Sequence, residues 1–298
     1  MSDRLKHRNR FKVVAMKHFF LLVVSFLILP LASAAPKFVE GPSRFLVLAG
    51  GSAEFTADHR AVTLVSGPGE GRRLMIYAHG GAGLTRADED RVAIFRKLPF
   101  DVVYFDAYRM NDLDSRWANR NLSDTAKQDL IGKILTGAIE HFQKLGYTSI
   151  VLYGQSNGAR VVINAPAELA NQSSIKLILA EAPSNYGHPL PEKLNVPTKV
   201  FVGLKDNWAG RSEDDLMWLR INPVSGMSLK DWIGVQQSQS GPVSVELYQG
   251  AGHSFHYGPL TPITRKLRGF DTVGYLGAPP EVTQKYERDI EMATRGLE

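Results

Sequence analysis

One short segment of the chain carries the residue types that nucleophilic catalysis needs. Ser156 lies at the centre of Gly-Gln-Ser-Asn-Gly, which runs from Gly154 to Gly158. The apolar residues 149–153 before it have the character of a strand, and residues 159–163 can continue as a helix. A strand, a tight turn and a helix around G-x-S-x-G form a nucleophile elbow, whose two glycines let strand and helix pass closely. The other interpretation is a glycine-rich turn. The elbow predicts that Ser156 is a nucleophile, held in a strained turn above the positive end of a helix.

A serine hydroxyl needs a base to take its proton and an acid to orient that base. His253 follows the strand predicted at residues 243–248, and Asp206 follows the one at 198–203. Because parallel strands share one carboxyl edge, we expect both side chains beside Ser156. Glu181, which follows the strand at 176–180, is the alternative acid, and His253 could instead be an ordinary loop histidine.

Two further patterns bear on what the site binds. The run His79-Gly80-Gly81-Ala82-Gly83 follows the strand predicted at 73–78, and such a run can turn backbone N–H groups toward a ligand. A phosphate loop is disfavoured, because no G-x-G-x-x-G or Lys-Ser/Thr pair follows. His253 and His256 lack the glutamate of H-E-x-x-H, so no metal site is predicted.

The elements that position these residues alternate between strands and helices. Further strands are predicted at 44–48, 61–65 and 101–106, and helices at 92–98, 126–145, 213–219, 229–236 and 281–295. We expect a capping box at Thr125 and Gln128, and a break before Pro166 followed by a second short helix. Residues 107–122 form a predicted loop, which is either a cleft wall or a solvated surface loop, and Tyr108 and Arg109 in it are candidate substrate contacts. The pattern predicts a single α/β domain with a doubly wound, mostly parallel sheet.

The amino terminus has the composition of an export signal. A basic segment, an apolar run at 19–29 and the small residues 32–35 predict a signal peptide over 1–34 and a mature domain over 35–298, periplasmic or secreted. The alternative is an uncleaved membrane anchor, and translation could also start at Met16. The full chain has 35 basic and 30 acidic residues. Residues 1–34 hold six of the basic residues and one of the acidic ones, so residues 35–298 hold 29 of each. This balance argues against a nucleic-acid surface, and without cysteine the fold depends on its core.

Four loops together resemble the dienelactone hydrolase family of α/β-hydrolases, in particular its exported serine branch. They are His79-Gly80-Gly81, the elbow 154–158, the segment 203–208 with Asp206 and Trp208, and Gly250-Ala251-Gly252-His253-Ser254-Phe255. The resemblance spans about residues 72–296. It implies Ser156 as nucleophile, Asp206 as acid and His253 as base, with an oxyanion hole from the backbone N–H groups of Asn157 and Gly81 or Ala82.

The chain also departs from that family. The founding enzymes have cysteine where this chain has Ser156, Ala159 and Pro166 alter the helix behind the elbow, and Asn207 and residues 209–210 change the acid loop beside Trp208. Trp208 is a candidate substrate contact, with a packing role as the alternative, and Tyr257 is expected to pack.

These observations predict an exported serine hydrolase that cleaves a small carboxylic ester or lactone, without a metal or organic cofactor. A peptidase or amidase on the same fold is one alternative. A binding protein that keeps the fold without turnover is the other.

Overall fold

The computed structural model describes residues 73–297, except positions 96, 209, 211, 213, 268 and 269, and three short strands between residues 37 and 65. The predicted signal peptide over 1–34 and its cleavage site lie outside the described residues. Among the described residues, none of the helices combines the length and the apolar character needed to span a bilayer.

The core of the fold is a sheet whose central strands are parallel. Its strand order is β1-β2-β3-β5-β4-β6-β7-β8-β9. The strands from β5 to β9 in this order pair in parallel, whereas β3 pairs with β5 antiparallel. Their bounds are β1 Lys37–Val39, β2 Phe45–Leu48, β3 Val62–Val65, β4 Arg73–Ala78, β5 Asp101–Tyr104, β6 Ser149–Gln155, β7 Ile175–Glu181, β8 Thr198–Gly203 and β9 Val243–Tyr248. The predicted doubly wound sheet and its early edge strands are confirmed.

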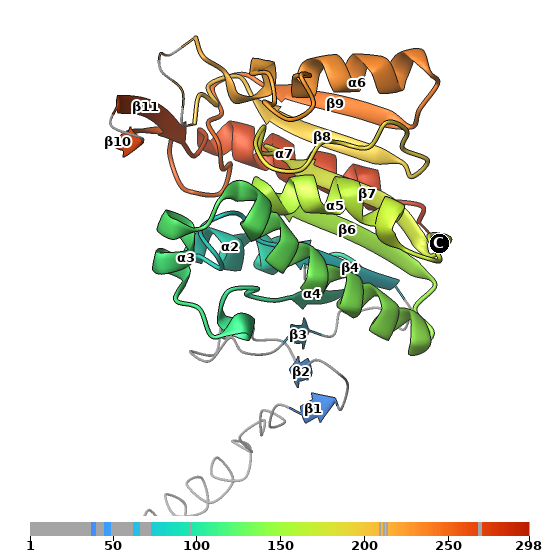
Figure 1. The fold of residues 1–298 in the computed structure, drawn as a ribbon. Helices are drawn as coiled ribbons and strands as arrows, with labels where there is room; N and C mark the ends of the chain where they lie inside the picture. The colour runs from blue at the N-terminus through green and yellow to red at the C-terminus, as the bar shows by residue number, and fades with distance from the viewer. Residues whose placement is uncertain are drawn as a thin grey trace, which may run out of the picture. The chain divides into compact units, whose positions relative to one another are not determined.

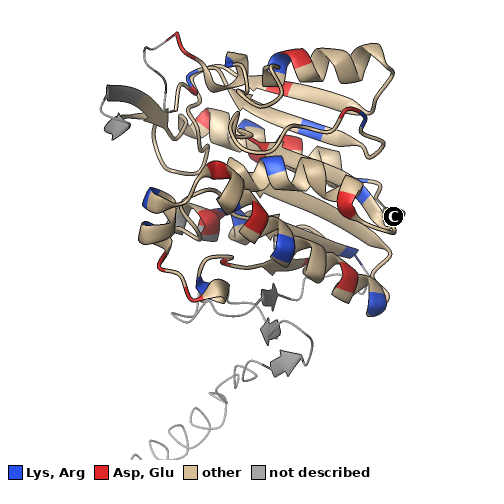
Figure 2. Ribbon diagram, viewed as in Figure 1, with Lys and Arg blue, Asp and Glu red and all other residues tan. Residues whose placement is uncertain are grey.

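Helices cover both faces of this sheet (Figure 1). One face packs against α4 (Asp124–Lys144), α5 (Asn157–Glu168) and α6 (Leu229–Ser238), and its core is mainly aliphatic. The other face packs against α2 (Arg86–Phe95) and α7 (Pro280–Thr294), and its core is rich in tyrosine and phenylalanine. Every residue of β6 is buried, because this strand has both neighbours and both helical layers around it. Acidic and basic residues alternate over the outer helices and loops and do not separate by sign (Figure 2).

Two helix starts differ from the predictions, and side-chain caps explain both. Helix α2 begins at Arg86 and not at residue 92, because the amide and hydroxyl of Thr85 both donate to the Asp88 carboxylate at 2.6 Å. Helix α4 begins at Asp124, where the Ser123 hydroxyl accepts from Ala126 N at 3.1 Å. The predicted capping box at Thr125 and Gln128 is therefore wrong.

The expectation of a break before Pro166 is also wrong. Helix α5 runs through Pro166 to Glu168, so the proline removes one backbone hydrogen bond from a final turn that stops two residues later. No second helix begins before β7.

Three further segments differ from the sequence predictions. Residues 107–122 contain a 3-10 turn, η1 (Arg109–Asn111), and helix α3 (Ser115–Asn121), which Asp114 caps through Trp117 N. The helix predicted at 213–219 is reduced in the described residues to the 3-10 turn η2 (Met217–Leu219), because Met217 N donates to Asp206 O and leaves the helical pattern. After β9, the strands β10 (Thr261–Leu267) and β11 (Phe270–Leu276) form an antiparallel pair that the sequence analysis missed.

A close backbone approach joins β6, α5 and β4. A Cβ atom on Gly154 would lie 2.3 Å from Gly158 O, and one on Gly158 would lie 2.2 Å from Ala78 O. Such distances are shorter than any contact that real Cβ atoms make, so both positions require glycine, as the elbow predicts.

Replacing either glycine by alanine is expected to lower the free energy of unfolding by about 3 kcal/mol, because the new methyl group meets backbone that cannot move aside. Urea denaturation followed by circular dichroism measures this loss. Gly137→Ala in α4 is the matched control. A methyl there meets nothing within 4 Å and favours the helix by about 1 kcal/mol. Wild-type stability in Gly154→Ala would contradict the close approach.

Candidate active site

Ser156 occupies the turn between β6 and α5. Its backbone angles are φ 54° and ψ −114°, a left-handed conformation that is costly for a residue with a side chain. The turn is fixed because Ser156 N donates to Glu181 O at 2.9 Å while Arg160 N and Ser184 N both donate to Ser156 O. The strained turn that the elbow predicts is therefore present, with the serine directly before the first residue of α5.

The structure brings Ser156, His253 and Asp206 together. Ser156 Oγ lies 2.9 Å from His253 Nε2, and Asp206 Oδ2 lies 3.0 Å from His253 Nδ1. With its proton on Nδ1, the imidazole donates to the carboxylate and offers the Nε2 lone pair to the serine hydroxyl. All three residues are buried, with 8%, 4% and 2% of their surfaces exposed. The arrangement can therefore remove a proton from Ser156, which is the first requirement of nucleophilic attack.

The glycine run after β4 is held in place by residues that follow β5. His79 Nδ1 donates to Gly80 O at 2.7 Å, and its Nε2 accepts from Ala107 N at 2.9 Å. The Tyr108 hydroxyl donates to Gly81 O at 3.1 Å. These contacts fix Gly81 and the exposed Ala82, the two predicted oxyanion donors of this loop, relative to the sheet.

The third predicted oxyanion donor, Asn157, is the first residue of α5. Backbone N–H groups in the first turn of a helix have no partner within it and carry its positive partial charge. The side chain of Asn157 donates to Asp124 Oδ1 at 3.0 Å and accepts from Gln128 Nε2 at 2.8 Å. Two residues of α4 therefore orient the helix start, and the sequence analysis missed both roles.

The fold can now be compared with known proteins. No protein-family model and no curated protein sequence matches the chain. Among solved structures, dienelactone hydrolase from Anabaena variabilis matches with a TM-score of 0.52 at 13% identity, over 78% of this chain and 89% of that one. This chain has an α/β-hydrolase fold. The expected resemblance to dienelactone hydrolases is confirmed at the level of the fold.

Two other solved structures match with lower scores. A serine hydrolase homologue from Coxiella burnetii has a TM-score of 0.47 at 15% identity, over 75% of this chain and 91% of that one. Esterase PE8 has a TM-score of 0.47 at 13% identity, over 77% of this chain and 96% of that one.

Within this α/β-hydrolase fold, Glu181 is not the residue that contacts the histidine. Its carboxylate accepts two hydrogen bonds from Arg91, at 2.9 and 2.8 Å, in the core behind the site. Burial alone would raise the pKa of Glu181, but the Arg91 guanidinium lowers it to about 2, so the carboxylate is charged. The alternative in which Glu181 is the acid that contacts the His253 imidazole is therefore not supported by the geometry.

Trp208 lies flat against the imidazole of His253. The two ring centroids are 5.3 Å apart and the ring planes differ by 7°. Trp208 N also donates to Asp206 Oδ1 at 3.2 Å. Trp208 thus packs on the histidine, and whether it also contacts a substrate remains a prediction.

The candidate substrate contacts after β5 occupy different environments. Tyr108 is fully buried, and its hydroxyl donates to Gly81 O in the glycine run after β4. The Arg109 side chain is 46% exposed and lies 3.9 Å from Asp106 Oδ2. Of the two, Arg109 is therefore the one that can meet a ligand at the surface.

His256 lies against α7 and takes no part in the hydrogen bonds that join Ser156, His253 and Asp206. Its ring packs near Tyr286, and Nε2 lies 3.6 Å from Glu287 Oε1, while neither ring nitrogen has a hydrogen-bond partner. Across the described part of the chain, no three His, Cys, Asp or Glu side chains gather as metal ligands would.

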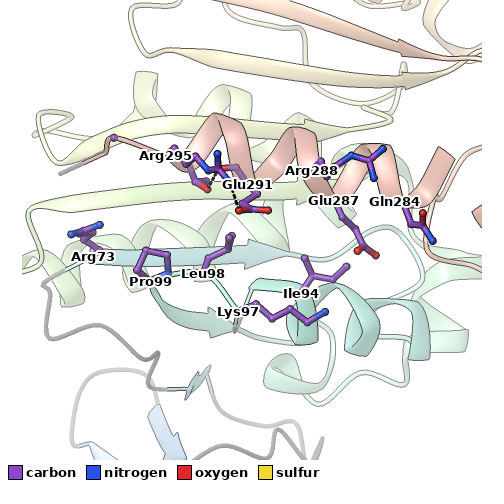
Figure 3. Close-up of a pocket in the computed structure, with 12 residues that line it drawn as sticks. Arg73, Ile94, Lys97, Leu98, Pro99, Gln284, Glu287, Arg288, Glu291 and Arg295 are labelled. Atoms are coloured by element: carbon purple, nitrogen blue, oxygen red, sulfur yellow. Dashed lines mark hydrogen bonds and ion pairs between the residues drawn. The ribbon is translucent and has the colours of Figure 1, made fainter. Parts of the chain in front are cut away.

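A groove lies away from this site. It encloses about 620 Å³ between α7 and the end of α2, with Arg73, Lys97, Arg288 and Glu291 among its lining residues (Figure 3). Arg73 begins β4, so the groove opens at the amino edge of the sheet, whereas Ser156 follows the carboxyl end of β6.

Two buried groups should make the folded protein sensitive to acid. Burial, with a smaller contribution from Arg91, lowers the pKa of His256 from 6.5 to about 4, so the unfolded chain binds this proton more readily. Stability present above pH 6.5 should fall as the pH drops toward 4. Glu181, with its pKa lowered from 4.5 to about 2, adds a further loss below pH 4.5.

Thermal unfolding followed across this pH range tests the assignment. His256→Phe should reduce the change in melting temperature between pH 6.5 and pH 4, because it removes the group that titrates in this range. His188→Phe is the control, since the His188 side chain is 44% exposed and pairs with Asp129 at the surface. If the melting temperature of His256→Phe falls with pH as steeply as that of the wild type, another group causes the loss of stability.

Proposed function

We propose that this chain is a serine hydrolase that cleaves a carboxylic ester or lactone through an acyl-enzyme on Ser156. The observation that carries the proposal is the hydrogen-bonded series from Ser156 through His253 to Asp206 at the carboxyl edge of the sheet. It is supported by the strained turn at Ser156 and by the start of α5 directly behind it. Solved structures with related folds carry the names dienelactone hydrolase and esterase.

The proposed reaction begins when His253 Nε2 takes the proton from Ser156 Oγ as this oxygen attacks the carbonyl carbon. Asp206 keeps Nδ1 protonated and stabilises the imidazolium that forms. The oxyanion of the tetrahedral intermediate accepts from the backbone N–H groups of Asn157 and of Gly81 or Ala82. The C–O bond to the leaving group then breaks, and His253 gives its proton to the departing oxygen.

The second half of the reaction releases the acyl group. His253 takes a proton from water, the hydroxide formed attacks the acyl carbon, and a second oxyanion is held by the same donors. Collapse of this intermediate returns the proton to Ser156 and frees the carboxylic acid. The sequence of steps requires no metal and no organic cofactor.

Ser156→Ala is expected to lower kcat/KM for short p-nitrophenyl esters by at least about a thousandfold, because the acyl-enzyme cannot form. Asp206→Asn should lose a similar factor, since the imidazole would then lose the carboxylate that fixes its tautomer. Both are measured as p-nitrophenolate release by residues 35–298, with esters of two, four, eight and twelve acyl carbons.

Labelling by a fluorophosphonate provides the independent readout. The wild-type chain should be labelled at Ser156, and Ser156→Ala should not. If the wild type neither hydrolyses any ester nor takes up the label, the chain is a binding protein on this fold.

We also propose that the chain is exported, on the basis of the basic and apolar pattern of residues 1–34. Expression of the full sequence in a bacterial host should yield a product in the periplasm or medium that begins at Ala35. Amino-terminal mass spectrometry identifies the first residue. A membrane-bound product that retains residues 19–29 would favour the anchor instead.

A further inference from the structure

Behind the proposed triad, a fully buried ion pair joins α2 to the end of β7. Arg91 Nε and Nη2 donate to the two carboxylate oxygens of Glu181, at 2.9 and 2.8 Å. The two side chains are 1% and 0% exposed. Nothing in the proposed reaction uses either charge, so the pair needs another explanation.

Both members of this pair contact the loop that carries His253. Arg91 Nη2 donates to the hydroxyl of Ser254, and Phe255 N donates to Glu181 Oε1 at 3.2 Å. These are the two residues that follow the histidine. The backbone of Glu181 also contacts the nucleophile, because its carbonyl oxygen accepts from Ser156 N at 2.9 Å. Glu181 therefore forms hydrogen bonds both to the turn at Ser156 and to the loop that follows His253.

The ion pair is itself fixed from several sides. The hydroxyls of Tyr153 on β6 and Tyr286 on α7 both donate to Glu181 Oε2. Arg91 Nη1 donates to Asp88 Oδ1 at 3.0 Å, one turn earlier on α2. Ala182, directly after Glu181, has φ 45°. This left-handed conformation is strained for alanine, so the contacts around it must hold the backbone in place.

The energetics favour a positional role over a stabilising one. Removing two charges from water costs several kcal/mol for each ion, and apolar residues of similar size often stabilise a core equally well or better. Hydrogen bonds differ from apolar contacts because they fix direction as well as distance. A charged pair at this place is therefore better suited to set the relative position of two loops than to raise stability.

We propose that Arg91 and Glu181 are positioning residues that set the His253 loop against Ser156, and thereby hold Nε2 at the distance needed for proton transfer. This inference rests on the proposed function for its kinetic consequence. Its structural consequence, the orientation of the imidazole toward Asp206, does not depend on turnover.

The test compares three variants of the mature chain. Ser254→Ala removes the hydroxyl that accepts from Arg91 and leaves the ion pair intact. Glu181→Gln removes the charge and keeps the shape. Asp289→Asn is the matched control, because this buried carboxylate accepts from Tyr248 and Lys285 and makes no described contact with the loops of the triad.

At a temperature well below all melting temperatures, Glu181→Gln should lower kcat for a short p-nitrophenyl ester by roughly tenfold or more with little change in KM, because a small misplacement of a catalytic group is costly. Ser254→Ala should lower kcat by a few fold in the same manner. Asp289→Asn should lower the melting temperature while kcat stays within about twofold of wild type. If kcat stays at the wild-type value in both Ser254→Ala and Glu181→Gln, the proposal is overturned.

The proton NMR signal of the His253 ring N–H that donates to Asp206 distinguishes the positioning role from the proposed hydrolase function. If the wild type has no hydrolase activity, the proposed function fails, and this signal alone decides the positional role. Its loss or broadening in Ser254→Ala but not in Asp289→Asn supports the role, and an unchanged signal refutes it. Because Ser254→Ala keeps the ion pair, the test also stands if Glu181→Gln does not fold.

Discussion

The close passage of β6 past the start of α5 is the constraint on which the rest of the site depends. At Gly154 and Gly158 the two backbones leave no room for a Cβ atom, so the chain must reverse within a single residue between them. That residue is Ser156, whose unusual backbone angles are the geometric result of the reversal. The same reversal places the side chain at the carboxyl edge of the sheet and the positive end of α5 directly behind it. Position, strain and electrostatics at Ser156 thus have one common origin.

The two faces of the sheet contribute to the site in different ways. The aliphatic layer beneath α4 and α5 meets the site through side chains such as Gln128, which contacts Asn157 and the loop after β7. The aromatic layer beneath α2 and α7 contains the buried Arg91 and Glu181, which contact the loop of His253. The part of the site around Ser156 and Asn157 is therefore organised by one helical layer, and the loop of His253 by the other.

Much of this arrangement follows from local sequence. The strands 73–78, 198–203 and 243–248 have the predicted bounds. The first two are mainly apolar and buried, which leaves few alternatives to a parallel strand. The third alternates apolar and polar residues, as suits its place at the edge of the sheet. That Ser156, His253 and Asp206 lie at one edge of the sheet could be predicted, since each residue lies in the loop that follows a parallel strand.

What could not be read from the sequence depends on contacts between distant segments. Gln128 has the right spacing for a capping box, yet its amide is used by Asn157 and Tyr186, which lie far along the chain. In the described residues, the helix expected at 213–219 is reduced to the turn η2, because Met217 N donates to the backbone oxygen of Asp206. The start of α2 was visible in principle, since Thr85 and Asp88 have capping-box spacing, but the role of Glu181 was not. An acidic residue at a strand end has the same local pattern whether it faces a histidine or an arginine.

The stacking of Trp208 on His253 limits how the histidine can move. The indole covers one face of the imidazole, and the Asp206 carboxylate holds the far edge of the ring. A rotation of the imidazole about its bond to Cβ would break that hydrogen bond and drive a ring edge toward the indole. A mechanism in which the ring flips between taking a proton and giving it away is therefore unfavourable in this fold. In the proposed reaction, one nitrogen in one orientation then has to serve both the attacking and the departing oxygen, and these two atoms must come to it in turn.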